Sequence, residues 1–164
     1  RMETSLLVEQ ILALQNRLQA LEDREAIRQL IASYGPAVDS HRLQDAAALW
    51  VEDGEYAVAG FGAHTGRGAL GDLLAAPHHQ QLLRDGCAHI LSAPYIQLHG
   101  QRAVALNYSV VLRHQGDAYT PERVAANRWE LEQVDGHWRV LSRRNALLDG
   151  SAAAQELFHL AAHA

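Results

Sequence analysis

Residues 123–147 read RVAANRWELEQVDGHWRVLSRRNAL, and this stretch decides the fold. Two runs rich in Val, Leu and Trp are separated by Asp135 and Gly136. Asp-Gly between two alternating runs favours a two-residue turn with left-handed backbone angles. The stretch therefore predicts an antiparallel hairpin with strands at 123–134 and 137–147.

Upstream of this hairpin, the segments 88–98 and 102–114 have the same β character. Their limits are turn signals, at His99-Gly100 and at Gly116-Asp117 with Pro121. We expect four long strands in an antiparallel meander, preceded by a short strand at 55–61.

The first third of the chain is predicted to be helical. Residues 22–35 place apolar side chains on one face, and this helix should end before Pro36, because proline removes a hydrogen bond from a helix interior. Residues 44–51 predict a further helix, and short helical pieces are expected at 69–75 and 79–83. Ser151 can cap a last helix that runs to about His163.

Residues 4–21 have their own apolar pattern, which we call the leucine seam. It consists of Leu7, Ile11, Leu14, Leu18 and Leu21, at alternating spacings of four and three. Such spacing makes a narrow stripe typical of coiled coils, although it lasts only about two heptads. Packing onto its own domain and pairing with a second subunit both remain open.

Helices followed by an antiparallel meander predict an α+β fold in which helices cover one face of the sheet. We expect a helical extension at 1–21, one domain at 22–150 and a C-terminal helix at 151–164. If the sheet curls, its concave side and the helices enclose a cavity, which is a common kind of small-molecule site.

Composition limits the classes of function. The chain has 164 residues and a formal charge of -5, with its arginines scattered, so a nucleic-acid partner is not expected. Cys87 is the only cysteine, which fits a reducing, cytoplasmic setting. Glu3, Glu9 and Gln10 interrupt the apolar residues of the N-terminal segment, so neither a signal peptide nor a membrane span is expected there.

The order of several short motifs resembles the SnoaL-like group of the NTF2-like superfamily. These motifs are YGPAVD at 34–39, LW at 49–50, DGEY at 53–56, CAH at 87–89 and DGHWR at 135–139. Within the superfamily the chain is most similar to the scytalone dehydratases and hexachlorocyclohexane dehydrochlorinases. The resemblance implies a cone with a strongly curved, mostly antiparallel sheet, no cofactor, and a histidine held by an aspartate. The matching positions are His89 and Asp39.

His89 lies in an almost wholly apolar run, Ala88 to Tyr95, so it should lie on or near the covered side of the sheet. An imidazole, which ordinarily titrates near neutral pH, suits proton transfer, and a carboxylate at one ring nitrogen would fix its tautomer. In the related lyases this histidine takes a proton from carbon. The structural alternative is a buried histidine bonded to backbone, with Asp39 as a helix-end residue.

Two further residues are candidates for the chemistry. Tyr34 lies five residues before Asp39 and could donate a hydrogen bond to a substrate oxygen or leaving group, or could simply belong to the core. Only one of Arg143 and Arg144 can face inward on a regular strand. Counting from Trp138 selects Arg144, which the resemblance places near the leaving group.

The predicted cavity lining consists mainly of aromatic residues, most of which would equally serve as core. For Asn127 a position outside the pocket is equally open. The candidates that we assign to substrate binding are Trp50, Tyr56, Phe61, Tyr108, Asn127 and Trp129.

No metal site is expected. His78 and His79, with His64, do not supply three ligands of defined geometry, and surface positions are expected for His159 and His163.

The function predicted from these residues is a cofactor-independent lyase, a dehydratase or β-eliminating enzyme, for a small cyclic or aromatic substrate. Its His-Asp dyad would be the general base. The alternatives are an isomerase like the ketosteroid isomerases, a polyketide-cyclase-like enzyme, or a non-catalytic binding or assembly protein of the same fold. The isomerase alternative lacks its paired acids, because Val58 and Asn127 stand where aspartates are required. A homo-oligomer, dimer or trimer, is expected, with no membrane partner.

Overall fold

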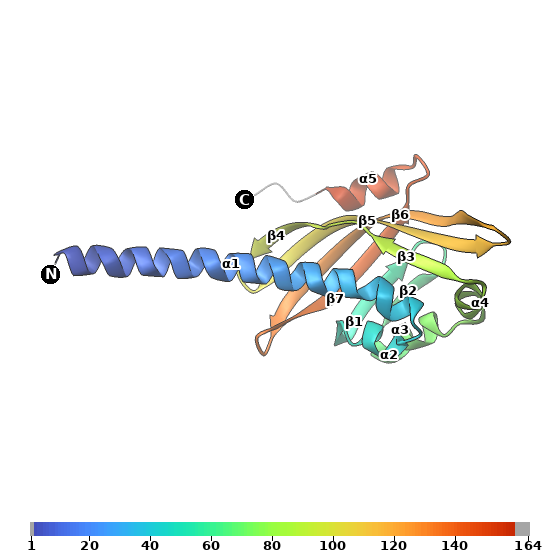
Figure 1. Ribbon diagram of the computed structural model, residues 1–164, viewed down its shortest axis with the longest axis horizontal. Helices are drawn as coiled ribbons and strands as arrows, with labels where there is room; N and C mark the ends of the chain where they lie inside the picture. Colours follow the sequence, from blue (N-terminus) through green and yellow to red (C-terminus); the bar gives the residue numbers. More distant parts are fainter. Residues whose placement is uncertain (1, 160–164) are drawn as a thin grey trace.

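A curved mixed sheet forms the framework of the protein in the computed structural model, which describes residues 2–159 (Figure 1). The helices are α1 (Met2–Asp39), α2 (Leu43–Ala47), α3 (Arg67–Leu74), α4 (Pro77–Asp85) and α5 (Ala152–Phe158). The strands are β1 (Trp50–Val58), β2 (Gly62–Thr65), β3 (Cys87–Leu91), β4 (Tyr95–His99), β5 (Arg102–Gln115), β6 (Ala118–Val134) and β7 (His137–Leu147). The α+β class predicted from the sequence is confirmed.

The strands follow the order β2-β1-β7-β6-β5-β3, and β4 pairs with the first half of β5. All pairs are antiparallel except β1 with β7, which is parallel. The long strands β5, β6 and β7 therefore form the centre of the sheet, and the short strands form its edges.

The hairpin at 135–136 is confirmed. Val134 pairs with His137, and Asp135 and Gly136 have φ angles of 51° and 78°. Both angles lie in the left-handed region, as a two-residue primed turn requires.

Two strand limits differ from the predictions because prolines act differently in different contexts. The expected strand 88–98 is divided into β3 and β4, and Pro94 lies in the break. By contrast β6 begins at Ala118 and contains Pro121, which lies at an irregularity where Val111 pairs with Arg123 and Leu112 with Pro121. A bulge tolerates proline because it already interrupts the ladder of hydrogen bonds.

Helix α1 is continuous from Met2 to Asp39, so the expected helix limits at Glu22 and before Pro36 are wrong. The change of apolar pattern near Glu22 marks a change in the face that packs, and no glycine, proline or cap there ends the helix. Pro36 lies in the last turn, where its missing N–H affects one bond, while Ala37 and Val38 beyond it are buried.

The helix expected at 44–51 is shorter than predicted. α2 ends at Ala47, and Trp50 already begins β1, where it pairs with Val140 of β7. The indole Nε1 of Trp50 donates a hydrogen bond to the carbonyl of Glu55 at 3.0 Å, so the tryptophan is buried without losing its polar contact.

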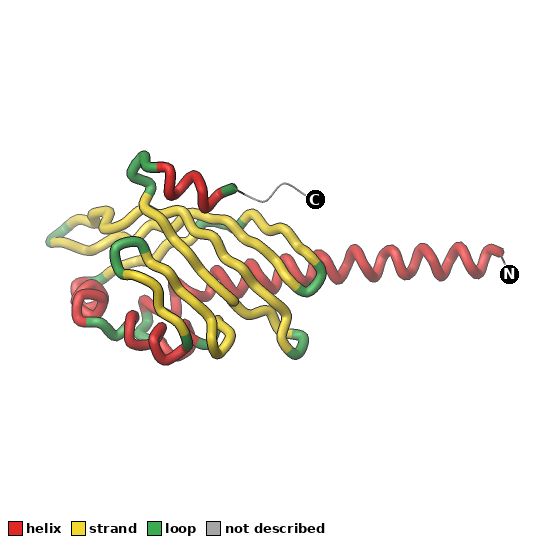
Figure 2. Tube along the Cα trace, turned by 180° about the vertical axis from the view of Figure 1, so that it is seen from behind, coloured by secondary structure: helices red, strands yellow, loops and turns green. Residues whose placement is uncertain are grey.

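Different helices pack on the two faces of the sheet. The C-terminal half of α1 packs on the concave face, while its N-terminal half projects beyond the sheet (Figure 1). Helices α3 and α4 follow the edge strand β2 in the chain, and α5 contacts β6 and β7 on the outer face (Figure 2). The short helical pieces predicted at 69–75 and 79–83 are thus confirmed, whereas the part of the last helix expected beyond residue 159 lies outside the described residues.

None of the helices among residues 2–159 has both the length and the apolar character needed to cross a membrane.

Candidate active site

Asp39 and His89, far apart in sequence, form a two-point contact. Asp39 ends α1 and His89 lies in β3. The ring Nδ1 of His89 lies 2.6 Å from Asp39 Oδ1, and the backbone N–H of His89 donates to Oδ2 at 2.8 Å. The carboxylate therefore fixes both the ring and the strand that holds it.

These contacts outweigh the cost of burying the carboxylate. Burial alone would raise the pKa of Asp39, but the hydrogen bonds from the His89 ring and amide lower it below its ordinary value. The carboxylate is thus ionised near neutral pH and accepts a proton from Nδ1. In a neutral ring this tautomer makes Nε2 the nitrogen without a proton, and Nε2 has no hydrogen-bond partner among residues 2–159.

Gly35 allows α1 and β3 to approach closely enough for this contact. A Cβ at position 35 would overlap the carbonyl oxygen of His89. The glycine in the motif YGPAVD is therefore a requirement of helix–strand packing one turn before Asp39.

Cys87 lies beside the pair, and its thiol donates to Asp39 Oδ1 over 3.5 Å. Burial, and then the charge of Asp39, raise the pKa of this thiol to about 12, so it stays protonated. Asp39, Cys87 and His89 are the one group of three potential metal ligands in the described part of the chain. Within this group the imidazole bonds the carboxylate directly, and the thiol donates to the same carboxylate oxygen.

His89 opens onto a cavity of about 180 Å³ between α1, the α3–α4 segment and the concave face. Its wall is partly apolar, and Tyr34, Tyr56, Leu74, Leu91 and Val111 contribute to it. Cavities of roughly 150 Å³ hold one benzene ring, so the space here suits a ligand with a single ring.

Tyr34 lies in this wall as predicted, buried to 3% exposure. Its ring centroid lies 6.5 Å from that of His89 in an edge-on arrangement. Burial, and then the nearby Tyr56, raise the pKa of the Tyr34 phenol above its ordinary value. The hydroxyl is consequently a neutral hydrogen-bond donor.

The prediction that Arg144 faces the cavity is wrong, because Arg143 takes that position. The register between β6 and β7 shifts where Leu131 pairs with Val140 and Glu130 pairs with Ser142. Leu141 is the extra residue, and this bulge reverses the alternation counted from Trp138. Arg143 is 2% exposed and lines the cavity.

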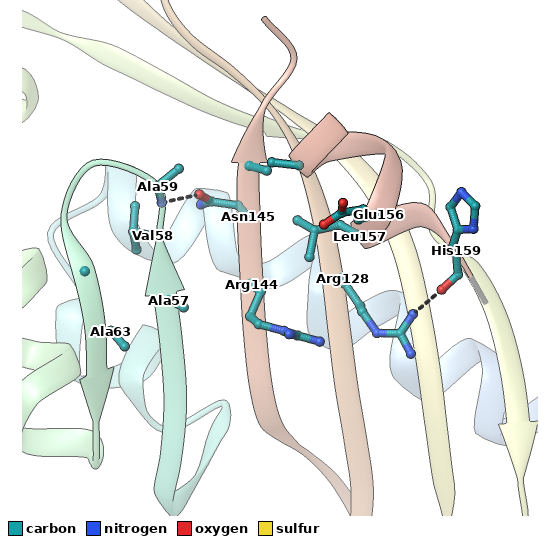
Figure 3. Close-up of a pocket in the computed structure, with 13 residues that line it drawn as sticks. Ala57, Val58, Ala59, Ala63, Arg128, Arg144, Asn145, Glu156, Leu157 and His159 are labelled. Carbon is teal, nitrogen blue, oxygen red and sulfur yellow. Dashed lines mark hydrogen bonds between the residues drawn. The ribbon is translucent and has the colours of Figure 1, made fainter. Parts of the chain in front are cut away.

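Arg144 lies instead in a groove on the outer face, between β1, β7 and α5 (Figure 3). It pairs across the strands with Arg128, and its nearest carboxylate oxygen is that of Glu130 at 4.0 Å. This groove is separate from the His89 cavity, although Asn145 and Val58 border both.

The six residues assigned to substrate binding are distributed over the fold. Tyr56 lines the cavity, and so does Phe61, which stacks on His78 with centroids 4.6 Å apart. Trp50 and Trp129 are core residues at 1% and 0% exposure behind the wall.

Tyr108 and Asn127 also lie outside the lining. Tyr108 is exposed on the outer face, where it contacts Phe158 of α5, because it alternates with the inward-facing Ser109. Asn127 is buried behind Arg143, whose Nε and Nη2 both donate to its Oδ1.

His79 is a cavity residue that the sequence analysis did not select. Its Nδ1 donates to the carbonyl of Leu74 at 2.7 Å, and its ring centroid is 5.4 Å from that of His89. Burial, and then the neighbouring His89, lower the pKa of His79, so it is neutral near pH 7. The available signal was its spacing from Leu82 and Leu83, which places it on the buried face of α4.

Residues 19–144 match the SnoaL-like domain family. Among solved structures, the chain is 47% identical to an NTF2-like protein with a cystatin-like fold from Novosphingobium aromaticivorans, with a TM-score of 0.87, covering 90% of this chain and 96% of that one. No curated protein sequence matches the chain.

Two more distant structures have related folds. A hexachlorocyclohexane dehydrochlorinase of type 3 from Novosphingobium barchaimii is 20% identical, with a TM-score of 0.70 over 80% of this chain and 90% of that one. A candidate scytalone dehydratase from Novosphingobium aromaticivorans is 22% identical, with a TM-score of 0.67 over 78% and 85%. The family match spans most of the chain and the curved sheet agrees with it, so the protein belongs to the SnoaL-like domain family of the NTF2-like superfamily.

Proposed function

We propose that the protein is a cofactor-independent lyase that acts on a small cyclic substrate by dehydration or a related β-elimination. The observation that supports this proposal is the Asp39–His89 contact at the wall of the cavity. Nδ1 of the histidine is occupied by the carboxylate, and Nε2 is left as a base. His79 and Tyr34, both neutral, add two polar groups to the wall close to His89.

In this reaction Nε2 of His89 removes a proton from a substrate carbon. The C–H bonding pair becomes the new double bond, and the leaving group departs from the neighbouring carbon with its own bonding pair. Asp39 stabilises the imidazolium that results. The Tyr34 hydroxyl donates a hydrogen bond to the substrate oxygen or to the leaving group.

An isomerase of the ketosteroid type receives less support from this cavity. Its paired acids have no equivalent, because Val58 lines the cavity and Asn127 is occupied by Arg143. Within residues 2–159, Glu122 is the only carboxylate in the lining, and its Oε1 already pairs with Arg113 at 3.0 Å. A cavity of about 180 Å³ also suits one ring better than a fused ring system.

The proposed function is tested by Asp39→Asn. We expect it to fold normally and to lose roughly 10²–10⁴-fold in turnover, because the amide cannot support the imidazolium. The measurement is the absorbance of the new double bond with one-ring β-hydroxy and β-chloro carbonyl compounds. Asp45→Asn, at an exposed helix position, is the control.

A substrate-free readout accompanies this assay. In the wild type the Nδ1 proton of His89 should give a downfield proton NMR signal, which Asp39→Asn should lose. Wild-type protein without turnover on the compound set, or equal turnover in Asp39→Asn, would contradict the lyase proposal.

We also propose that the leucine seam pairs with the same seam of a second copy. All five of its residues are exposed to between 46% and 63%, which leaves a continuous apolar stripe in water. With Leu18 at heptad position a and Leu21 at d, Arg17 is at position g and Glu22 at position e. In a parallel pair, Arg17 of each copy therefore lies beside Glu22 of the other copy. This charge match favours a parallel two-stranded pair over an antiparallel one.

A further inference from the structure

Three arginines reach the cavity that contains His89: Arg113, Arg123 and Arg143. Arg113 is compensated by two carboxylates, Asp85 at 2.9 Å and Glu122 at 3.0 Å. Arg123 and Arg143 have no carboxylate partner anywhere in residues 2–159. The wall therefore contains two positive charges that the chain itself leaves uncompensated.

Arg143 is rigidly held with one nitrogen unused. Its Nε and Nη2 donate to Asn127 Oδ1 at 3.0 and 2.8 Å, and Asn127 is fixed in turn by Ser109 Oγ at 2.8 Å. The guanidinium carbon lies 4.6, 4.7 and 4.2 Å from the ring centroids of Tyr34, Tyr56 and Trp129. Nη1 is buried and has no hydrogen-bond partner among the described residues.

A buried charged N–H without an acceptor destabilises a folded protein, and native structures rarely contain one unless ordered water, an ion or a ligand completes it. The aromatic rings favour the cation but cannot accept a full charge-assisted hydrogen bond. Arg143 lines the cavity with its charge unpaired by any carboxylate of residues 2–159, so it favours an anionic acceptor that comes from outside the chain.

Arg123 presents a second guanidinium to the same space. Its Nη2 donates to the carbonyl of Ala59 at 2.7 Å and to Asn145 Oδ1 at 2.9 Å, and its Nε is buried without a partner in residues 2–159. Both acceptors are neutral, so the charge remains. An anion between Arg123 and Arg143 would relieve two unpaired charges at once.

We propose that the cavity binds the carboxylate of a one-ring acid, with Arg123 and Arg143 as its anion-binding residues. This inference rests on the proposed lyase function and narrows its substrate class to cyclic or aromatic carboxylic acids. Guanidinium groups suit the planar carboxylate because their N–H groups form a fork.

The position of the carboxylate also orients the ring. The ring of Tyr34 lies 4.6 Å from the Arg143 guanidinium carbon and 6.5 Å from the His89 ring. A ligand held by the arginines would pack against Tyr34 and extend toward the base. The cavity volume of about 180 Å³ accommodates one ring with its carboxylate and little more.

The test uses benzoate and its neutral isostere benzamide, with affinities measured by isothermal titration calorimetry on the full chain. We expect benzoate to bind one per chain and benzamide at least roughly tenfold more weakly, because charge-assisted hydrogen bonds are lost. 2-Naphthoate should also bind at least roughly tenfold more weakly than benzoate.

Arg123→Met and Arg143→Met should each weaken benzoate binding by roughly 10–100-fold. Arg144→Met is the matched control, since it removes the adjacent outward arginine and should leave the affinity unchanged. If Arg143→Met does not fold, Arg123→Met still decides the question, because Arg123 is only partly buried. Equal affinities for benzoate and benzamide, or equal losses in Arg123→Met and Arg144→Met, would overturn the anion site.

The anion site and the lyase activity can fail separately. Asp39→Asn should bind benzoate like the wild type, because it leaves both arginines intact. If the protein turns over neutral compounds in an Asp39-dependent way but does not bind benzoate, the anion site is overturned and the lyase proposal stands. Specific benzoate binding without elimination of any cyclic acid overturns the lyase proposal alone.

Discussion

At the residue scale, the position of His89 depends on the absence of a side chain at Gly35. The helix carries Asp39 and the strand carries His89, and the two elements meet where residue 35 lies under the His89 carbonyl. Family resemblance predicts both members of the pair. The glycine at position 35 has no such explanation in the sequence, because close approach is a property of two packed elements.

Gly35→Ala should therefore destabilise the protein by about 1–3 kcal/mol, since overpacking displaces β3. The same shift should lengthen the Asp39–His89 contact and weaken the downfield Nδ1 proton signal. Urea denaturation and proton NMR measure the two effects.

The control for this variant is Gly71→Ala, also within a helix. An added Cβ there meets only the side-chain nitrogen of Gln44, at an ordinary 3.8 Å. It should be neutral or stabilising by about 0.4–1 kcal/mol. A Gly35→Ala protein as stable as the Gly71→Ala protein would contradict the close-packing argument.

At the element scale, α1 has two apolar faces with different roles. Ile27, Ile31 and Val38 are buried against the sheet, whereas Leu14 and Leu18 in the leucine seam remain exposed. The helix continues without a break between these faces, so its N-terminal half is a rigid arm (Figure 1). An arm of this kind can join two copies without touching either cavity.

Leu14→Ser combined with Leu18→Ser should convert a dimer into a monomer, because the apolar contacts of the seam are lost. Sedimentation velocity should give twice the chain mass for the wild type and one chain mass for the variant. Asn16→Ser, on the opposite face of the helix, is the control and should remain dimeric.

The parallel orientation is tested by charge. Arg17→Glu should raise the dimer dissociation constant by roughly 3–30-fold, and adding Glu22→Arg should restore it. Failure of the double variant to recover would argue against the parallel arrangement, and a wild-type monomer would remove the seam from assembly altogether.

At the scale of the whole molecule, folding buries an ionisable histidine in the cavity wall. The pKa of His79 is lowered by burial first and then by His89, with His78 acting in the same direction and Asp39 opposing. Below its ordinary pKa of about 6.5 the unfolded chain takes up a proton that the folded chain resists. This contribution to stability is complete above that pH and is lost as the pH falls.

The free energy of unfolding should consequently fall between about pH 7.5 and about pH 5.5, and His79→Asn should reduce this fall. Asparagine retains a donor for the Leu74 carbonyl but does not titrate. Asp39, whose pKa is lowered, contributes its pH dependence only below about pH 4, outside this window.

Urea denaturation at the two pH values measures the effect, and His137→Asn, an exposed histidine, serves as the control. The same pH dependence in wild type and His79→Asn would rule out the burial of His79 as its cause.

Local patterns in the sequence determined most of the framework. The Asp135-Gly136 turn, the long strands 102–114 and 137–147 and the apolar face from Ile27 to Tyr34 all follow from rules that act within a few residues. They also determined the α+β class. Pro94 and Pro121 show the limit of such rules, because one interrupts a strand and the other is absorbed at a bulge.

Only the tertiary structure decided which side chains meet in the cavity. The bulge at Leu141 turned Arg143 inward and Arg144 outward, and a bulge depends on pairing with β6 that a single strand does not reveal. His79 became a neighbour of His89 through the packing of α4 on the sheet. The sequence by itself determined the elements and the Asp39–His89 candidates, because these depend on local patterns and family resemblance. Only the structure decided which arginines face the cavity and how large the cavity is, because both depend on contacts between residues far apart in the chain.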